Sequence, residues 1–336
     1  MKELNVAIVG ATGAVGQELL KVIDEHKFPY KSLKMLASSR SAGKIINFQG
    51  KDYVVEETTK ESFEGVGLAL FAGGTASREF GRYAQSQGVV VIDNSSTFRL
   101  EDDVPLIIPE VNGHAAKNHQ GLIANPNCST ILMVGALNPI YRKSRIKRVV
   151  VSTYQAVSGA GKAGLDELTE QARQVLDGEP IHPSAFQHQI AFNLIPHIDV
   201  WQEEDYTKEE MKLVHETHKI LEDNDIQITP TAVRVPVFRS HAESIYLETE
   251  DVITADEARE LLEAAPRVIV KDNPRENVYP MPVDTANTDD IYVGRVRNDL
   301  YVENGLNMWV CFDQIRKGAA ANAVQIAELL LENDWI

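Results

Sequence analysis

Residues 5–20 read NVAIVGATGAVGQELL, a β-branched run followed by glycines at positions 10, 13 and 16. Beyond the glycines, apolar residues at 15, 19, 22 and 23 line one face of a predicted helix. A strand, a tight turn and an amphipathic helix in this order are typical of a nucleotide-binding unit, because N–H groups at the helix start bind phosphate. The spacing GxxGxxG differs from the dinucleotide fingerprint GxGxxG, so a turn whose glycines serve packing alone is the alternative. We favour nucleotide binding and expect contacts from Gly10, Thr12, Gly13, Ala14 and Val15.

The first 95 residues alternate β-branched runs with helical patterns, which predicts a parallel sheet with crossover helices. The predicted strands are 6–9, 33–37, 68–72 and 89–93. Longer strands follow from about residue 149 and indicate a mixed sheet, at 149–155, 232–237, 243–249, 268–270 and 290–296. A last helix is expected over 318–331. We therefore predict an α/β protein with a Rossmann-like dinucleotide-binding domain over 1–127, on which about 316–336 pack back, and a mixed-sheet α+β domain over 128–315.

The composition of the 336-residue chain, 43% hydrophobic and 24% charged, excludes disordered and coiled-coil classes. The 49 acidic and 33 basic residues leave a net charge of -16, which argues against nucleic acid as a partner. The apolar run at 131–134 ends at Gly135, far short of the roughly 20 residues that span a bilayer, and the start lacks a signal-peptide pattern. We expect no membrane partner and a cytoplasmic location.

The second predicted strand runs into Ser39, Arg40 and Ser41 where an NAD-binding protein would carry an acid for the ribose. Hydroxyls and a guanidinium suit a 2′-phosphate, so NADP is the expected cofactor, and a polar loop facing water is the alternative. Gly74 and Thr75 follow the third strand at its carboxyl end, where an open parallel sheet binds ligands.

The chain has two cysteines, too few for a disulfide framework and without a CxxC pair for zinc. Cys128 directly precedes an apolar helical pattern, and the free N–H groups and dipole of a helix start favour a thiolate. A buried structural cysteine is the alternative, and it describes Cys311 among apolar neighbours well. His215 and His218 lie one helical turn apart without a third ligand, so no metal site is expected.

Five motifs follow one another along nearly the whole chain: 10–16, the run DNSSTFR at 93–99, PNC at 126–128, YQAVSGAG at 154–161 and RND at 297–299. With these motifs the chain resembles the aspartate-semialdehyde dehydrogenase family, in its shorter bacterial branch. The resemblance implies NADP-dependent oxidation of aspartate 4-semialdehyde with uptake of phosphate. The reverse reduction of 4-aspartyl phosphate serves lysine, methionine, threonine and diaminopimelate biosynthesis. The family resemblance further implies a homodimer, with a catalytic and dimerisation function for 128–315.

The resemblance also implies residue roles. Cys128 is the nucleophile that forms the thioester, His241 is the acid/base, and Gln155 orients the substrate. The implied substrate contacts are Arg99 and Lys212 to phosphate, Arg234 to the α-carboxylate, Glu209 to the amino group, and Asn127. Further cofactor contacts are expected from Ser158, Gly159 and Asn322, with 158–161 as a loop that closes on the nicotinamide.

Taken by residue type alone, Glu209 and Lys212 fit an i, i+3 pair on a helix surface better than a binding site. Arg234 and His241 are seven residues apart and would face opposite sides of a regular strand. Because Pro236 cannot donate to a sheet ladder, we predict an irregular strand or a turn between them.

Three other functions remain open at this stage. N-acetyl-glutamyl-phosphate reductase shares the layout, but its acylated substrate does not need a carboxylate at 209. A thiol hydrolase would use Cys128 and His241 with a merely structural glycine loop, and an NADP-binding sensor would perform no chemistry.

Overall fold

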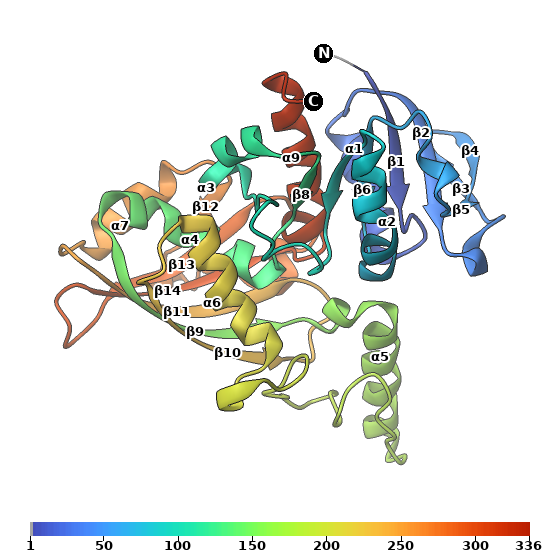
Figure 1. Ribbon diagram of the computed structural model, residues 1–336. Helices are drawn as coiled ribbons and strands as arrows, with labels where there is room; N and C mark the ends of the chain where they lie inside the picture. Colours follow the sequence, from blue (N-terminus) through green and yellow to red (C-terminus); the bar gives the residue numbers. More distant parts are fainter. Residues whose placement is uncertain (1–2) are drawn as a thin grey trace. The chain divides into compact units, whose positions relative to one another are not determined.

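The computed structural model describes residues 3–336, which form two compact units (Figure 1). The first unit comprises the residues up to Asn127, the short segment Lys219–Leu221 and Gly318–Ile336. The second comprises Cys128–His218 and Glu222–Lys317. Among the described residues, no helix has the length and apolar character needed to cross a bilayer.

The first unit contains a six-stranded sheet in the order β5-β2-β1-β6-β7-β8, and every pair in it is parallel, as predicted. Its strands are β1 (Leu4–Val9), β2 (Tyr30–Ala37), β5 (Glu56–Glu57), β6 (Leu68–Phe71), β7 (Val90–Asp93) and β8 (Leu122–Ala124). A separate antiparallel hairpin joins β3 (Ile45–Phe48) to β4 (Lys51–Val54). The helices of this unit are α1 (Ala14–Glu25), α2 (Gly74–Ser86), α3 (Pro109–Asn112) and α9 (Ala321–Glu332).

The core of the first unit is built from residues near both ends of the chain. Apolar residues of β1, β6 and α1 pack in one cluster with α9, which contacts α1, α3 and β7. Strand β1 is buried on both faces of the sheet, which explains its nearly continuous apolar sequence. The predicted last helix is confirmed, and its first turn, Arg316–Ala320, is π-helical and continues directly into α9.

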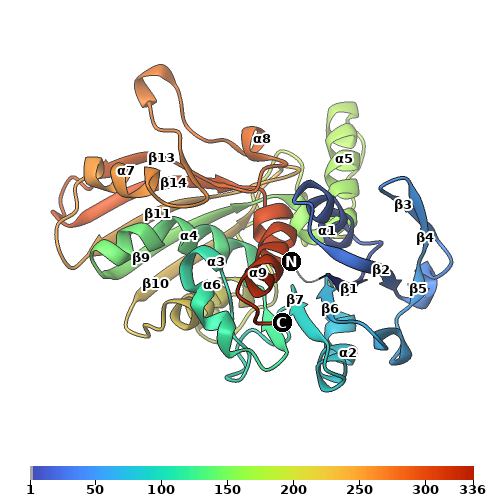
Figure 2. The same ribbon diagram turned by 90° about the horizontal axis from the view of Figure 1, so that it is seen from above.

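The second unit contains a mixed sheet in the order β10-β9-β11-β14-β13-β12. Its strands are β9 (Ile146–Gln155), β10 (Gln227–Arg234), β11 (His241–Thr249), β12 (Val268–Val270), β13 (Ile291–Asn298) and β14 (Gly305–Phe312). Its helices are α4 (Cys128–Lys143), α5 (Gly161–Asp177), α6 (Lys208–Leu221), whose last turn belongs to the first unit, α7 (Ala255–Glu263) and α8 (Pro282–Thr285). Helix α4 packs on β9, β11, β13 and β14 and lies along the sheet in Figure 2.

Two strand predictions for the second unit are corrected. The strand predicted over 232–237 is wrong at both ends: β10 starts at Gln227, and the chain leaves the sheet after Arg234, ahead of Pro236. Strand β14 was not predicted, because Cys311 is buried together with its neighbours Val310 and Phe312 and the period-two pattern is lost.

The glycine turn after β1 is a close backbone contact. Gly10 has φ +89°, and its N–H donates to Leu36 O at 2.8 Å. A Cβ on Gly16 would lie 2.2 Å from Gly10 O, so only glycine lets the first turn of α1 approach the loop this closely. At Gly13 the nearest atom, also Gly10 O, would be 3.4 Å away, an ordinary contact.

We expect Gly16→Ala to lower the free energy of unfolding by about 1–3 kcal/mol, because the backbone must shift to relieve the overlap. Chemical denaturation followed by circular dichroism measures this. Gly13→Ala in the same loop is the control and should unfold like the parent protein. Equal stabilities of the two variants would show that the close approach at Gly16 does not matter.

Candidate active site

Three strand ends meet at one edge of the mixed sheet (Figure 1). Strand β9 ends at Gln155, its parallel neighbour β10 ends at Arg234, and its antiparallel neighbour β11 begins at His241. Arg234 lies directly opposite Gln155 in the register. The turn at 235–240 returns the chain to the far side of β9, so the predicted interruption between Arg234 and His241 is confirmed. Two strands, rather than one irregular strand, therefore carry these side chains.

His241 is fully buried at this edge. Its Nδ1 accepts a hydrogen bond from the backbone N–H of Ala156 at 3.0 Å, and its Nε2 lies 3.5 Å from the side-chain amide of Gln155. Burial and the nearby Arg234 guanidinium lower the pKa of His241 to about 3, against a smaller opposite effect of Glu209. The imidazole is therefore neutral at physiological pH.

Arg234 is also buried, and its Nη1 donates to Ala156 O at 2.8 Å. Burial lowers the pKa of Arg234, while the charges of Glu209 and Cys128 raise it, and a guanidinium stays protonated at neutral pH. A Cβ on Gly159 would lie 2.8 Å from Arg234 Nη1. Gly159, which is predicted to contact the cofactor, therefore leaves room for the Arg234 guanidinium because it has no side chain.

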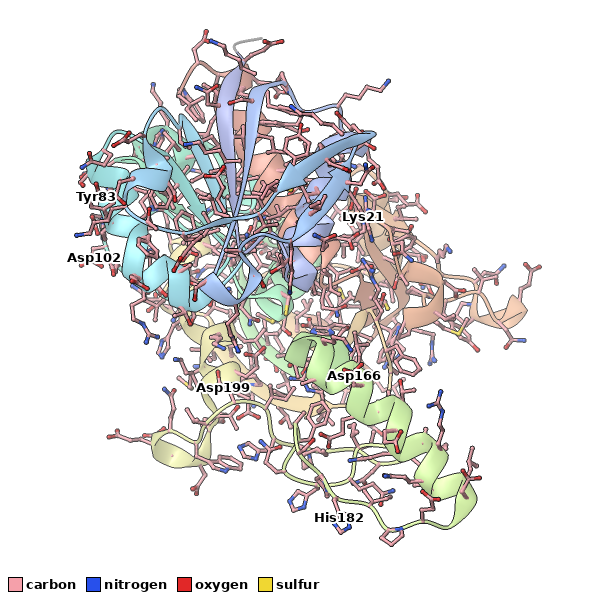
Figure 3. The ribbon with its side chains drawn as sticks, turned by 90° about the vertical axis from the view of Figure 1, so that its right-hand side faces the viewer. Lys21, Tyr83, Asp102, Asp166, His182 and Asp199 are labelled. Atoms are coloured by element: carbon pink, nitrogen blue, oxygen red, sulfur yellow. The ribbon has the colours of Figure 1, made fainter. Side chains whose placement is uncertain are left out.

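Glu209 and Lys212 on α6 do not form a surface pair. The Glu209 side chain is 7% exposed, and its two oxygens bind Gln155 Nε2 at 3.1 Å and Lys212 Nζ at 2.8 Å. Lys212 Nζ also contacts Asp199 at 2.9 Å (Figure 3 labels Asp199). Burial alone would lower the pKa of Lys212, but Glu209 and Asp199 together raise it. The alternative of a surface pair is wrong, because both side chains are largely buried and Lys212 also binds Asp199, which local spacing cannot show.

The start of α6 is fixed by a capping box. Thr207 accepts from the N–H of Glu210 at 3.3 Å, and the carboxylate of Glu210 accepts from the N–H of Thr207 at 2.7 Å. The second oxygen of Glu210 accepts from the N–H of Ala232 on β10 at 2.9 Å. This contact joins the helix start to the sheet and thereby places Glu209 beside Gln155.

Cys128 is the first residue of α4 and is partly exposed, as a nucleophile at a helix start requires. Its charge is among the groups that raise the pKa of Arg234, so the two side chains interact electrostatically. Cys311 is fully buried, and burial raises the pKa of its thiol to about 12. The prediction that Cys311 is structural is confirmed.

Seven of the predicted nucleotide contacts line one cavity of about 560 Å³ in the first unit. Its lining includes Gly10, Thr12, Gly13, Ser39, Arg40, Gly74 and Thr75, together with Glu57. Ala14 and Val15 open α1, and Ser41 lies 3.3 Å from the Thr12 hydroxyl. The sequence analysis did not foresee Glu57, which reaches this place only because β5 pairs with β2.

Three other predicted residues of the first unit are buried. Arg99 donates from Nε to Asn125 O and from Nη2 to Asn94 O, both at 2.9 Å. Asn322 donates its amide to Ile107 O at 3.0 Å and to the side chain of Asn125 at 2.7 Å. Through these bonds Arg99 and Asn322 have a structural role. Asn127 is buried as well. Their substrate and cofactor roles stay predictions.

Two family descriptions match the chain: "Semialdehyde dehydrogenase, NAD binding domain" over residues 5–119 and "Semialdehyde dehydrogenase, dimerisation domain" over residues 137–317. The aspartate-semialdehyde dehydrogenase of Aquifex aeolicus is 55% identical and aligns over 98% of this chain and 99% of its own. The chain belongs to the aspartate-semialdehyde dehydrogenase family.

Other members of the aspartate-semialdehyde dehydrogenase family agree. The Bacillus subtilis enzyme is 47% identical over 97% of both chains. The crystal structure of aspartate semialdehyde dehydrogenase II from Vibrio cholerae matches with a TM-score of 0.96 at 48% identity, over 98% of this chain and 99% of that one. A second structure of that enzyme, complexed with ASA, matches with a TM-score of 0.96 at 47% identity, over 99% of both chains. The sequence-based family assignment and the two-part fold class are confirmed.

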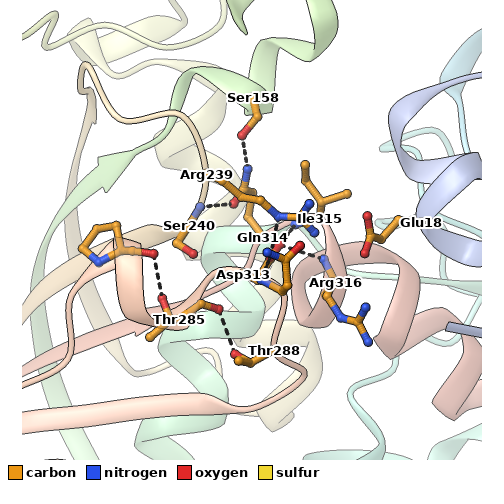
Figure 4. Close-up of polar contacts among 12 residues, drawn as sticks. Glu18, Ser158, Arg239, Ser240, Thr285, Thr288, Asp313, Gln314, Ile315 and Arg316 are labelled. Atoms are coloured by element: carbon orange, nitrogen blue, oxygen red, sulfur yellow. Dashed lines mark hydrogen bonds and ion pairs between the residues drawn. The ribbon is translucent and has the colours of Figure 1, made fainter. Parts of the chain in front are cut away.

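In this member of the aspartate-semialdehyde dehydrogenase family, Gln314 links Ser158 to Ser240, the residue before His241 (Figure 4). Its Nε2 donates to Ser158 Oγ at 2.5 Å, and its Oε1 accepts from the N–H of Ser240 at 2.8 Å. Ser240 has φ +75°, an uncommon value for a residue with a side chain, and directly precedes His241. The segment at 158–161, predicted as a mobile loop, is a short 3₁₀ turn, Val157–Ala160, that leads into α5.

Glu243 is an unexplained feature of the same strand. It is fully buried, and neither carboxyl oxygen has a hydrogen-bond partner among the described residues. Burial raises the pKa of this carboxyl well above its usual value, so the group is protonated in the folded chain. Sequence pattern does not reveal it, because glutamate is also common on exposed strand faces.

We expect Gln314→Leu to lower kcat about tenfold or more, because the N–H of Ser240 loses its buried partner and the turn before His241 loosens. Steady-state kinetics would measure this. Ser240→Gly is the control: glycine adopts a positive φ readily and keeps the N–H, so its kcat should stay near the parental value. If Gln314→Leu keeps the parental kcat, the bridge does not position His241.

We expect Glu243→Gln to stabilise the protein increasingly above pH 5. The folded-state pKa is raised, so the native chain retains a proton that the unfolded chain releases, and stability falls by about 1.4 kcal/mol per pH unit until the folded-state pKa is reached. Glutamine removes this loss. Urea denaturation at pH 5 to 8 measures it, with the exposed Glu303→Gln as control. Identical pH dependences of Glu243→Gln and the parent would contradict the buried neutral carboxyl.

Proposed function

We propose that the chain is an NADP-dependent aspartate-semialdehyde dehydrogenase that reduces 4-aspartyl phosphate to aspartate 4-semialdehyde and catalyses the reverse phosphorylating oxidation. The observation that carries this proposal is the sheet edge where Gln155, Arg234 and His241 meet Glu209. The biosynthetic role in lysine, methionine, threonine and diaminopimelate formation follows from the family.

The charges at this edge fit an amino-acid substrate. Arg234 offers a planar guanidinium to an α-carboxylate, and Glu209 offers a buried carboxylate to a free α-amino group. Lys212, held between Glu209 and Asp199, and Arg99 are proposed for the phosphate. An N-acetylated substrate would present the Glu209 carboxylate with an uncharged amide in place of an ammonium group, which disfavours N-acetyl-glutamyl-phosphate reductase. The family relative from Vibrio cholerae solved with ASA supports the smaller substrate.

The first-unit cavity fits NADP by the chemistry of its lining. The glycine turn leaves space for a pyrophosphate at the start of α1, and Ser39 and Arg40 offer donors to a 2′-phosphate. Glu57 lines the same cavity and could accept from a ribose hydroxyl, so NAD is the competing cofactor to compare. When bound, the dinucleotide supplies or accepts the hydride.

In the proposed mechanism the Cys128 thiolate attacks the acyl carbon of 4-aspartyl phosphate, and phosphate leaves from it. Gln155 orients the resulting thioester, and His241 acts at the carbonyl oxygen during hydride transfer. Arg234 and Glu209 keep the substrate's α-carbon groups in place. Collapse of the tetrahedral species then releases the aldehyde and regenerates the thiolate. In the reverse direction phosphate attacks the thioester.

A homodimer in the cytoplasm is part of the proposal. The family description for 137–317 is a dimerisation domain, and it includes exposed apolar side chains close together in sequence, at Phe192, Leu194, Val200 and Trp201. Exposed apolar side chains that form a patch mark protein–protein contacts. A reducing compartment would keep the Cys128 thiol available for catalysis.

We expect NADPH absorbance to rise when the protein is mixed with aspartate 4-semialdehyde, NADP and phosphate. Without phosphate the rise should stop after about one turnover, because the thioester accumulates. Cys128→Ser should lose nearly all turnover and still bind NADP in a fluorescence titration, whereas Cys311→Ser should turn over normally. Preference for N-acetyl-glutamate semialdehyde, or steady turnover without phosphate, would overturn the proposal.

A further inference from the structure

Lys219 lies in the last turn of α6, the turn that belongs to the first unit. Its Nζ donates to three backbone carbonyls of one loop, those of Arg99 at 2.8 Å, Glu101 at 2.7 Å and Val104 at 2.8 Å. An ammonium group has three hydrogens, so each of these carbonyls can accept one of them. Lys219 therefore joins the end of α6 to this loop.

The loop that Lys219 binds is the segment 94–105, which contains no helix or strand. Two turns shape its second half: the N–H of Glu101 donates to Phe98 O, and the N–H of Val104 donates to Glu101 O, both at 3.1 Å. The carbonyl of Glu101 accepts from Lys219 as well. Because the two turns share Glu101, a single ammonium group holds both of them.

The first half of the loop has its own support, the buried carboxyl group of Asp93 at the end of β7. This group accepts from the hydroxyl of Ser77 at 2.5 Å and from that of Ser95 at 2.6 Å. It also accepts from the N–H of Ser95 at 3.1 Å, and the N–H of Thr97 donates to the Ser95 hydroxyl at 3.1 Å. Residues 95–97 are thus held without Lys219.

The outer side of the second half of the loop carries two ion pairs. Arg82 contacts Glu101 and Asp103, whose side chains are 42% and 46% exposed. Exposed pairs of this kind contribute little, because water and salt screen them. Hydrogen bonds from a charged donor to a carbonyl are stronger than neutral ones. Lys219, which is partly buried, therefore contributes more to holding residues 99–104 than the outer pairs do.

Arg99 is the residue of this loop that the proposed function assigns to phosphate. Two carbonyls, those of Asn125 and Asn94, fix its guanidinium, and Lys219 fixes its backbone carbonyl. A guanidinium binds phosphate through a planar fork, so the contact depends on the direction in which the fork points. A small shift of a binding group is costly when the contact is directional. The support of the Arg99 backbone therefore bears on phosphate binding.

We propose that Lys219 is a positioning residue for the phosphate step: it holds the backbone of residues 99–104 so that Arg99 keeps the orientation in which it binds phosphate. This inference rests on the proposed function, in which Arg99 contacts phosphate. Lys219 acts through Arg99, because the contacts of its ammonium group are to the carbonyls of the loop. The affinity for phosphate depends on Lys219, and hydride transfer does not.

Kinetics separate this role from a purely structural one. NADPH formation is measured with varied phosphate at saturating aspartate 4-semialdehyde and NADP. Lys219→Met keeps the apolar stem and removes the ammonium group, so we expect it to raise KM for phosphate about tenfold. The phosphate-independent burst of NADPH should keep its parental rate, because hydride transfer precedes the attack of phosphate. The amplitude of the burst counts the active protein in each preparation.

Matched variants complete the kinetic test. Lys219→Arg keeps the cation and its donors, and its KM for phosphate should stay within about threefold of the parental value. Lys117→Met removes an exposed lysine of the same unit and should behave like the parent protein. A parental KM in Lys219→Met, or a burst slowed as much as KM is raised, would overturn the proposal. If Lys219→Met does not fold, Lys219→Gln, which keeps two N–H donors, replaces it, and a parental KM there counts equally against the proposal.

Amide hydrogen exchange tests the positioning itself, without any turnover. In Lys219→Met we expect the N–H groups of Glu101 and Val104 to exchange about tenfold faster or more, because the carbonyls that shape their turns are no longer held. The N–H groups of Ser95 and Thr97 belong to the independently supported half of the loop and should exchange as in the parent protein. Unchanged exchange at Glu101 and Val104 would show that Lys219 does not hold the loop.

Arg99→Lys distinguishes failure of this inference from failure of the proposed function. A raised KM for phosphate in Arg99→Lys, with a parental KM in Lys219→Met, would overturn the inference alone. A parental KM in both variants would overturn the role proposed for Arg99 together with the inference that rests on it. Steady turnover of the parent protein without phosphate would overturn the proposed function.

Discussion

Burying charge at the edge of the mixed sheet is the constraint on which the rest of the second unit depends. Glu209, Lys212 and Arg234 are largely removed from water, and an isolated ion in that environment is strongly disfavoured. Each is retained because it has partners: Lys212 lies between Glu209 and Asp199, and Arg234 donates to a carbonyl. The capping box of α6 and the parallel pairing of β9 with β10 hold these partners in place.

The same burial sets the reactivity of the site. Electrostatic interactions are stronger where water is excluded, so one guanidinium and one carboxylate can recognise a small zwitterion with few other contacts. Burial also keeps His241 uncharged beside Arg234. The helix that Cys128 begins is buried almost all round, so the nucleophile is carried by a rigid element.

Several parts of the site were predictable and others were not. The turn between Arg234 and His241 followed from their odd spacing and from Pro236, and the structural part of Cys311 followed from its apolar neighbours. The burial of Glu209 and Lys212 did not follow, because Asp199, which binds Lys212, comes from a connection with no periodic pattern. Gln314 and Glu57 were missed because each lies beside residues that are distant in sequence. Glu243 was missed because its burial without a hydrogen-bond partner leaves no mark on the sequence pattern.

The sequence by itself determined the elements whose causes are local: the strand, glycine turn and helix at 5–20, the helix start at Cys128 and the change to longer strands near 149. Turn chemistry and apolar periodicity act over a few residues and can be read along the chain. Only the tertiary structure decided which charges are buried together and which backbone group holds the ring of His241. Those properties depend on desolvation and on donors supplied by strands far apart in sequence, which no local pattern specifies.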